Sequence, residues 1–457
     1  MKKVNLLAAA VLAAAFAMPA QADYTPNVNF SGYMRSGVQS QHINGYDVGT
    51  AGRLGAENDT YGEIGLGADL AKVDDTVWSV YTMLAVKSKV NGSTWQDNRA
   101  GEDRKFGDDS DTNGTWSSAL AFRQFFVNVK GMFDWDKDAN IWVGKRYYHR
   151  EDIHVTDLYY HDISGTGAGI ENLTAGPGKL SLAWLRHDFN NQKYINDFGG
   201  VLANNWMSYH SFDVQYDLPA WDGANLEFRA TFTQPRKDDS NSEYFTKAYG
   251  SQVLMAELSQ GYSLGWNKTV VKYTHGNVDQ TGGSKLGFAG AYASADGKYS
   301  TGGSTGAKNA YRWQFYNFGE THFTDNLGMF HVIAGTVADG YDHNLTDKDS
   351  DRAFQLIVRP YYKLTKMTRL VTELGMYTST DKKSTDKKID GSKYNKQVQK
   401  YTLAYAITPD AGNFWSRPEI RFYGTYLHSN GAVDLSEWGK TNKTNTFIVG
   451  AQVEAWW

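Results

Sequence analysis

The sequence contains no cysteine. Without thiols the chain can form no disulfide, no thiol nucleophile and no cysteine-ligated metal site. The zinc-protease spacing H-E-x-x-H is also missing from the sequence. Stability must therefore come from the fold itself, and we expect the protein to need neither a cofactor nor a metal.

Long apolar stretches are scarce as well. The first one, residues 6–17, follows two lysines and precedes the small-x-small sequence Ala20-Gln21-Ala22. This arrangement is typical of a secretory signal peptide, and the stretch is too short for a spanning helix, which needs about 20 apolar residues. We expect residues 1–22 to be removed and residues 23–457 to form one exported domain.

An excess of positive charge is missing too. The formal net charge is −4 at pH 7, and it becomes more negative when the two N-terminal lysines leave with the signal peptide. Nucleic acids attract basic proteins through their phosphates, so we expect no nucleic-acid partner.

Aromatic residues and glycine, in contrast, are plentiful. Aromatic residues make up 14% of the chain and glycines number 46, although the mean hydropathy is only −0.53. A transmembrane β-barrel reconciles these values, because only alternate residues of each strand face lipid while the others face water. A large secreted β-sandwich or propeller would show the same period of two, so composition alone leaves both folds open.

The C-terminal stretch favours the barrel. Between residues 447 and 457 every odd position is apolar, and the even positions are polar, glycine or tryptophan with Ile448 as the exception. A terminal aromatic such as Trp457 on the apolar face is common in outer-membrane barrels. Residues 28–35 alternate in the same way, so the first and last strands can pair and close the barrel.

Similar alternating stretches recur along the chain, separated by polar segments of alternating length. Short turns at one rim and long loops at the other are typical of outer-membrane barrels. At roughly 24 residues per strand and connection, the chain fits about 18 antiparallel strands, enough for a water-filled channel. The alternating stretches are 61–70, 180–185, 266–274, 327–337, 355–363, 401–407 and 420–427, and the long segments are 91–113, 190–205, 276–308, 338–352, 380–396 and 428–445.

Three short motifs could suggest other chemistry. Residues 261–265 match the G-x-S-x-G nucleophile pattern, but a strand pattern follows instead of the required helix, so we interpret them as a barrel turn. Residues 109–114 match the front of a calcium loop, whose twelfth position should be Glu and here is Leu120. The glycine cluster at residues 165–169 has no βαβ context, and we expect a flexible loop there rather than a nucleotide site.

Large aromatic residues share the expected water-facing side with charged residues. A ring on such a face has no core to join. Rings can cover the apolar face of a pyranose while charged groups bond to its hydroxyls, so the pattern predicts binding of a linear oligosaccharide. An interfacial aromatic girdle or a mistaken strand parity remains the alternative. The groups are Tyr33 with Arg35, Tyr61 with Glu63, Trp266 with Lys268 and Lys272, Trp415 with Arg417, Glu419 and Arg421, and Trp456 with Glu454 and Gln452.

The sequence resembles the maltoporin family along nearly its whole mature length. The most specific stretch is residues 144–165, beginning GKRYYHREDIH, which is similar to the strand that enters the family's inward-folded third loop. Further matches are residues 28–37, 53–55, 415–418 and 450–457. The resemblance implies an 18-stranded antiparallel transmembrane barrel with that loop as its constriction. It also implies a homotrimer, embedded in the outer-membrane lipid of a Gram-negative bacterium, that conducts maltose and maltodextrins.

The resemblance further implies roles for individual residues. Trp116 would reach the channel mouth of a neighbouring subunit, although Trp95 could occupy that place instead. At Arg123 the following Phe125 and Phe126 depart from the family pattern. The aromatic slide would be Tyr33, Tyr61, Trp266, Trp415 and Trp456, and the charged tracks and constriction would be Arg35, Arg53, Glu63, Arg123, Arg150, Asp157 and Tyr159.

Other functions stay open on the sequence alone. A general ion-selective porin, or a porin for sucrose or β-glucosides with weak maltodextrin selectivity, would share the fold. An ion filter would be lined mainly by charged rings rather than by an aromatic row. An outer-membrane enzyme or adhesin is a further possibility, but no nucleophile and base set is apparent, so we expect no enzyme. Surface loops of such barrels often serve as phage receptors, and the sequence leaves that role open.

Overall fold

The computed structural model describes residues 27–41, 43, 46, 48–57, 59–88, 118–190, 206–236, 250–276, 286–287, 310–341, 349–381, 395–431, 433–436 and 443–457. The expected signal peptide, the calcium-like segment 109–114, Trp95 and Trp116 lie outside these residues. No helix in the described part of the chain is long and apolar enough to cross a membrane.

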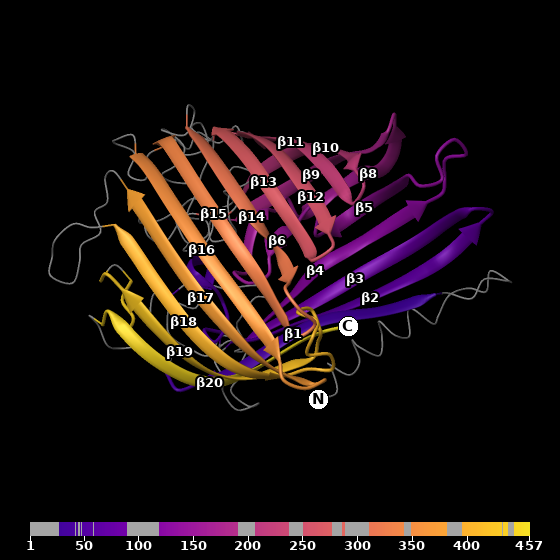
Figure 1. Ribbon diagram of the computed structural model, residues 1–457. Helices are drawn as coiled ribbons and strands as arrows, with labels where there is room; N and C mark the ends of the chain where they lie inside the picture. Colours follow the sequence, from indigo (N-terminus) through magenta and orange to yellow (C-terminus); the bar gives the residue numbers. More distant parts are fainter. Residues whose placement is uncertain are drawn as a thin grey trace.

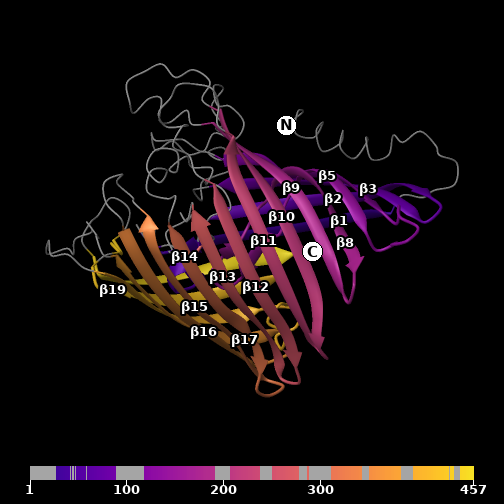
Figure 2. The ribbon, with the colours of Figure 1, turned by 90° about the horizontal axis from the view of Figure 1, so that it is seen from above.

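Eighteen antiparallel strands form one closed barrel (Figures 1 and 2). Neighbours along the chain pair with each other, β5 pairs with β8, and β1 pairs with β20, so the predicted closure of the sheet is confirmed. The barrel strands are β1 Val28–Gln39, β2 Thr60–Val73, β3 Thr76–Ser88, β4 Ser118–Lys130, β5 Asn140–Arg146, β8 Gly165–Ala175, β9 Gly178–Asn190, β10 Trp206–Trp221, β11 Ala224–Arg236, β12 Ser251–Tyr262, β13 Gly265–Gly276, β14 Tyr311–His322, β15 Leu327–Tyr341, β16 Asp349–Lys363, β17 Thr368–Asp381, β18 Lys396–Ile407, β19 Glu419–Ser429 and β20 Asn445–Trp456.

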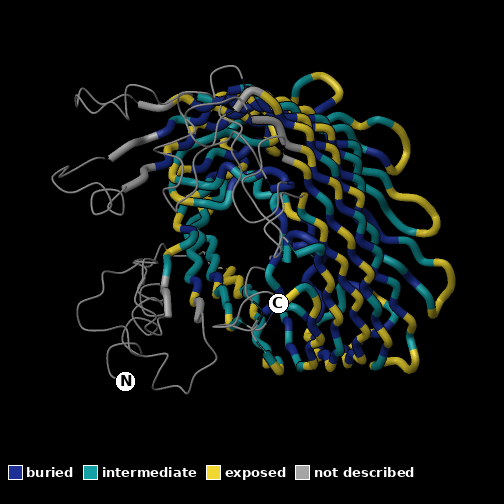
Figure 3. Tube along the Cα trace, turned by 90° about the vertical axis from the view of Figure 1, so that its left-hand side faces the viewer, coloured by how far each residue is buried: buried dark blue, intermediate teal, exposed yellow. Residues whose placement is uncertain are grey.

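The two faces of the wall differ in every second residue, which Figure 3 shows as alternating buried and exposed positions. The outer face is apolar and exposed, as a lipid-facing surface requires. The inner face carries polar and charged side chains, which pack against segments inside the barrel. In β18 the inner residues are Val398, Lys400, Thr402, Ala404 and Ala406, and the outer ones are Gln397, Gln399, Tyr401, Leu403, Tyr405 and Ile407.

The predicted parity of the last strand is confirmed. Gln452 and Glu454 are buried on the inner side, while Phe447 and Val449 are exposed outside. Ile448, the exception in the sequence pattern, faces inward and is fully buried in the apolar cluster that fills part of the lumen. It therefore obeys the strand period and departs only from the expectation that inner residues are polar.

Two expectations about connections have opposite outcomes. Residues 261–265 form the tight turn between β12 and β13, so the barrel-turn interpretation of the G-x-S-x-G match is confirmed. The expected flexible loop at residues 165–169 is wrong, because these residues begin β8. Gly167 and Gly169 lie close to the backbone of β9, where a β-carbon would come within 2.2 Å of the Trp184 carbonyl oxygen and 2.7 Å of the Leu182 carbonyl oxygen. Their function is close strand packing.

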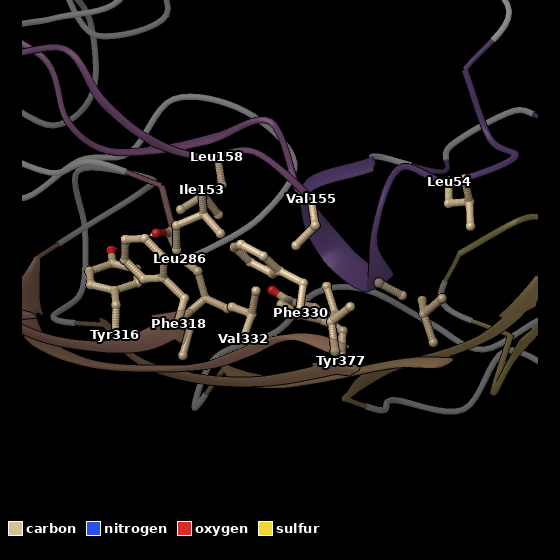
Figure 4. Close-up of a cluster of buried hydrophobic side chains, with 14 of the residues drawn as sticks. Leu54, Ile153, Val155, Leu158, Leu286, Tyr316, Phe318, Phe330, Val332 and Tyr377 are labelled. Atoms are coloured by element: carbon tan, nitrogen blue, oxygen red, sulfur yellow. Dashed lines mark hydrogen bonds between the residues drawn. The ribbon is translucent and has the colours of Figure 1, made fainter. Parts of the chain in front are cut away.

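Residues 147–164, which we call the inward loop, fold into the barrel as the family resemblance implies. They contain a small hairpin of β6 Glu151–Ile153 and β7 Leu158–His161. Ile153 and Leu158 are buried against the inner wall formed by β12 to β16, where they meet Phe318 and Val332 (Figure 4). Burial of these side chains, each contributing about 1.5–3 kcal/mol, holds the loop against one side of the lumen.

A second segment, residues 48–57, also lies inside the barrel, and it begins with the short helix α2 Val48–Ala51. Gln355 donates a hydrogen bond of 2.7 Å to the Gly49 carbonyl oxygen, and the Leu54 backbone N–H donates one of 3.1 Å to Glu373. Gly375 of β17 makes this docking possible, because a β-carbon there would come within 1.9 Å of the Ala51 carbonyl oxygen. We call residues 48–57 the inner segment.

We predict that Gly375→Val displaces the inner segment while leaving the strand pairing intact. Overpacking of this kind should lower the free energy of unfolding by about 1–3 kcal/mol. The measurement is urea unfolding in detergent micelles followed by tryptophan fluorescence. Gly335→Val is the matched control, since a β-carbon there meets nothing closer than 3.8 Å. Equal stability of the two variants would contradict the role of Gly375.

Candidate functional site

Aromatic side chains from distant parts of the chain form a row inside the lumen. The ring of Trp266 lies 6.4 Å from that of Trp415, which lies 6.3 Å from Trp456. Trp456 is the strand partner of Tyr33, and the Tyr33 ring lies 6.0 Å from Tyr61. All five aromatic residues expected in the slide therefore lie together, and the additional residue Trp116 falls outside the described residues.

The elements that carry the row explain its shape. Barrel closure places Tyr33 of β1 beside Trp456 of β20, and the β1–β2 register places Arg35 beside Tyr61. Trp415 departs from the expectation, since it lies in the connection before β19 and not on a strand. Its indole N–H donates a hydrogen bond of 3.1 Å to Glu320, which fixes the ring between Trp266 and Trp456.

Glu454 is the centre of a buried ionic network beside this row. Its carboxylate lies 3.1 Å from Arg53, 2.8 Å from Arg417 and 2.7 Å from Arg421, and it accepts a hydrogen bond of 3.0 Å from the Tyr33 hydroxyl. Arg417 also covers the Trp456 ring at 4.1 Å from its centre. The carboxylate is fully buried and the three guanidinium groups are nearly so, which makes the cost of losing one partner high, at about 3–5 kcal/mol.

Arg35 joins the barrel wall to the inward loop. It donates hydrogen bonds of 2.9 Å to Asp59 and 3.1 Å to Asp157, and it lies 3.1 Å from Glu57. Its guanidinium group also sits 5.5 Å from the centre of the Tyr61 ring. Charged and aromatic groups thus alternate along the same stretch of lumen.

A second polar cluster lies at the other edge of Tyr61. The Tyr61 hydroxyl bonds to Glu63, and the Tyr147 hydroxyl donates a hydrogen bond of 2.8 Å to the same carboxylate. Arg123 in turn donates a hydrogen bond of 2.5 Å to Tyr147. Arg123 can reach the lumen because β4 has a register shift at this point, where Gln124 pairs with Met83 and Phe122 with Leu84. That bulge is the reason why an Arg on this strand points inward despite its unusual phenylalanine neighbours.

The inward loop contributes the remaining predicted residues. Arg150 lies between two rings, 4.1 Å from the centre of Tyr147 and 4.3 Å from that of Tyr159, and it donates a hydrogen bond to the Tyr159 hydroxyl. Asp162 lies 3.8 Å from the Arg150 guanidinium group. These contacts hold the Tyr159 ring in one position inside the lumen.

Two titratable groups of the inward loop have fixed charge states. Burial would raise the pKa of Asp157, but the guanidinium groups of Arg53 and Arg35 outweigh it and hold that pKa below its ordinary value. Burial keeps the pKa of His154 well below its ordinary value, even though the Glu454 carboxylate acts in the opposite direction. At neutral pH we therefore assign a charged Asp157 and a neutral His154.

Several residues of the site were not predicted. His154 lies between two rings of the row, 5.3 Å from Trp415 and 5.5 Å from Trp456. Glu57 and Asp59 bind Arg35, and Tyr147 binds Glu63. His154 and Tyr147 could have been found from the sequence, because both lie in the stretch 144–165 that resembles the maltoporin family. Glu57 and Asp59 follow no strand period, so no pattern pointed to them.

A closed barrel with an apolar outer face, a charged lumen and an inward loop is a transmembrane porin. A model of the LamB porin family matches residues 28–457, and the chain belongs to this family. It is therefore a β-barrel of the outer membrane of a Gram-negative bacterium. Porins are channels, so the prediction that the protein is not an enzyme is confirmed.

Full-length relatives share this assignment. Maltoporin 1 of Klebsiella pneumoniae subsp. pneumoniae is 33% identical, with 99% of this chain and 98% of that protein covered. Maltoporin 2 of Yersinia pseudotuberculosis is 32% identical, with 94% of both covered. Among solved structures, OmpT of Vibrio cholerae aligns at 12% identity and a TM-score of 0.43, covering 96% of this chain and 99% of that one.

We predict that both Tyr159→Ala and Asp157→Asn raise the single-channel ion current. The first substitution removes the ring held inside the lumen, and the second breaks the ion pair that draws Arg35 toward the inward loop. Currents are measured in a planar bilayer, with Tyr405→Ala on the outer face as control. Because the pKa of Asp157 is lowered, acidification from pH 7 to 5 should not reproduce the Asp157→Asn effect. Unchanged current in both variants would place the constriction elsewhere.

Proposed function

We propose that the protein is a sugar-selective channel for facilitated diffusion of maltose and maltodextrins. The observation that carries this proposal is the row of Trp266, Trp415, Trp456, Tyr33 and Tyr61 along the lumen of the barrel. The names of the maltoporin relatives support the choice of sugar.

The row would act as a slide for one linear oligosaccharide. Each ring offers a flat apolar surface to the C–H face of one glucosyl unit. Ring centres about 6 Å apart let the next unit make contact before the previous one leaves. The sugar can therefore advance without losing all its contacts at once.

The charged residues beside the row would form hydrogen bonds with the sugar hydroxyls. Arg35, Glu63, Arg123, Arg150 and Asp157 are bonded to one another or to tyrosine hydroxyls. A sugar hydroxyl can replace one such bond by another of similar strength, so net binding stays weak. Weak binding suits a channel, which must release what it admits.

We predict that affinity rises from maltose to longer maltodextrins and levels off once the row is filled. At about 1 kcal/mol per ring, each added glucosyl unit should tighten binding roughly fivefold. Trp456→Ala should weaken maltohexaose binding by a similar factor, whereas Trp457→Ala, whose ring is exposed on the outer face, should spare it.

The measurement is sugar-dependent block of single-channel current by maltose and maltohexaose in both variants. Equal affinities for the two sugars, or a loss of binding in Trp457→Ala alone, would contradict the slide. Stronger block by sucrose or a β-glucoside than by maltose would instead support a porin for another sugar.

We also propose three features that the described residues do not test. One is the export signal that the sequence pattern indicates at residues 1–22; the other two, which the family resemblance implies, are a homotrimer and Trp116 at the mouth of a neighbouring channel. Small outward residues support the homotrimer: Gly62 and Ala68 of β2 and Ala451 and Ala455 of β20 pair with the outward residues Met34, Val28 and Val38 of β1. Such a surface lets another barrel approach closely.

We expect a trimer that resists detergent until it is heated. Ala451→Trp should break it by placing a large ring among the small outward residues of β2 and β20, whereas Ala230→Trp on the outer face of β11 should leave it intact. Light scattering in detergent and electrophoresis before and after heating measure the assembly. A monomer in the unmodified protein before heating would contradict the proposal.

A further inference from the structure

On the outer face of β5, β8, β9, β10 and β11, a row of polar side chains borders directly on a row of apolar side chains. Five side chains there follow one another as direct strand partners, near the rim that bears the long connections. They point outward, away from the lumen, and they are exposed or half-buried. The row consists of Lys145, Thr166, Arg186, His210 and Gln234, and we call it the basic row.

The next outward row toward the middle of the barrel is entirely apolar. It consists of Val143, Ala168, Trp184, Phe212 and Phe232, which are also direct strand partners. The two rows are two residues apart along each strand, or about 7 Å. Polarity therefore changes over the distance that separates hydrocarbon from lipid headgroups.

Ring contacts fix the position of this boundary. The Trp184 indole N–H donates a hydrogen bond of 3.0 Å to Nδ1 of His210, and the two rings are stacked at 16°. Trp184 also stacks on Phe212 at 9°. Tryptophan is enriched where hydrocarbon meets headgroups. Because Nδ1 of His210 accepts, its proton resides on Nε2, which is then a donor at headgroup level.

The basic row lies on the outer side of the membrane. Short turns such as residues 263–264 mark the opposite, periplasmic rim, and long connections mark the extracellular rim. The outer leaflet at this rim consists of glycolipids whose headgroups carry phosphates. Lys145 and Arg186 are two strands apart, about 10 Å, so one headgroup with two phosphates can contact both.

We propose that the basic row binds the phosphorylated headgroup of an outer-leaflet glycolipid. Arg186 supplies a planar fork for one phosphate and Lys145 a point charge for another, while Thr166 and His210 donate further hydrogen bonds. The apolar row below packs against the acyl chains of the same molecule. The site is on the outside of the barrel and does not depend on the sugar channel.

The test uses the double variant Lys145→Gln with Arg186→Gln in the folded, detergent-solubilised protein. The probe is bisphosphorylated lipid A, with binding measured by native mass spectrometry. Loss of two cations at a membrane surface should weaken binding on the order of tenfold or more. The control is Lys179→Gln, on the same strand β9 at the periplasmic rim, where Lys179 lies 2.9 Å from Asp138.

Each outcome decides the proposal. Weaker binding of lipid A in the double variant, with unchanged binding in Lys179→Gln, supports it. Dephosphorylated lipid A should bind both proteins equally and weakly. Unchanged lipid A binding in the double variant overturns the proposal. Two further outcomes would also overturn the proposal. An equal loss of phosphatidylglycerol binding would mean that the basic row recognises any anionic lipid. Loss of the oligomer with lipid A still bound would mean that the basic row contacts a second copy of the chain.

Discussion

A backbone that crosses hydrocarbon must pair all its N–H and C=O groups within the protein, and closure of the sheet satisfies this requirement. Here closure depends on the pairing of β1 with β20. The same pairing brings Tyr33 next to Trp456 and Glu454, which are more than 400 residues away in sequence. The interaction that makes the barrel possible in a membrane therefore also assembles the middle of the aromatic row.

Eighteen strands enclose more space than inner side chains alone can fill, and the chain uses two inner elements to narrow it. Both elements attach by apolar burial in the same cluster, the inward loop through Ile153 and Leu158 and the inner segment through Ala51 and Leu54. Hydrogen bonds to the wall add to this, joining the loop to β12, β13 and β16 and the segment to β16, β17 and β18. Both deliver charged residues to the row: Asp157 from the loop and Arg53 from the segment. The polar side of the lumen is thus built largely from residues that are not on the wall.

The sequence predicted the features that follow from the two-residue period of β-strands. It predicted the barrel, its closure, and the inward orientation of Tyr33, Tyr61, Trp266 and Trp456, because a period of two assigns each strand residue to one face. It failed where backbone geometry departs from the period. Trp415 enters the lumen from a connection, and the glycines at residues 165–169 form a strand because they allow close packing.

The ionic part of the site was predictable only in outline. Strand parity placed Glu454 and Arg421 in the lumen, but the carboxylates that bind Arg35 come from the irregular stretch that ends at Asp59. Partner choice there depends on how the inner segment docks, which is decided by contacts between residues far apart in sequence. Arg123 illustrates the same limit, since a single bulge in β4 decides its direction.

Two kinds of contact inside the lumen, apolar burial and buried ion pairs, respond to different conditions. Apolar burial weakens on cooling, so the anchoring of Ile153 and Leu158 loosens in the cold. Dissolved salt screens exposed charges but reaches buried pairs poorly, so the contacts of Glu454 persist in concentrated electrolyte. Cooling and salt therefore act on different contacts inside the lumen: cooling weakens the apolar anchors of the inward loop, whereas salt has little effect on the buried ion pairs of Glu454.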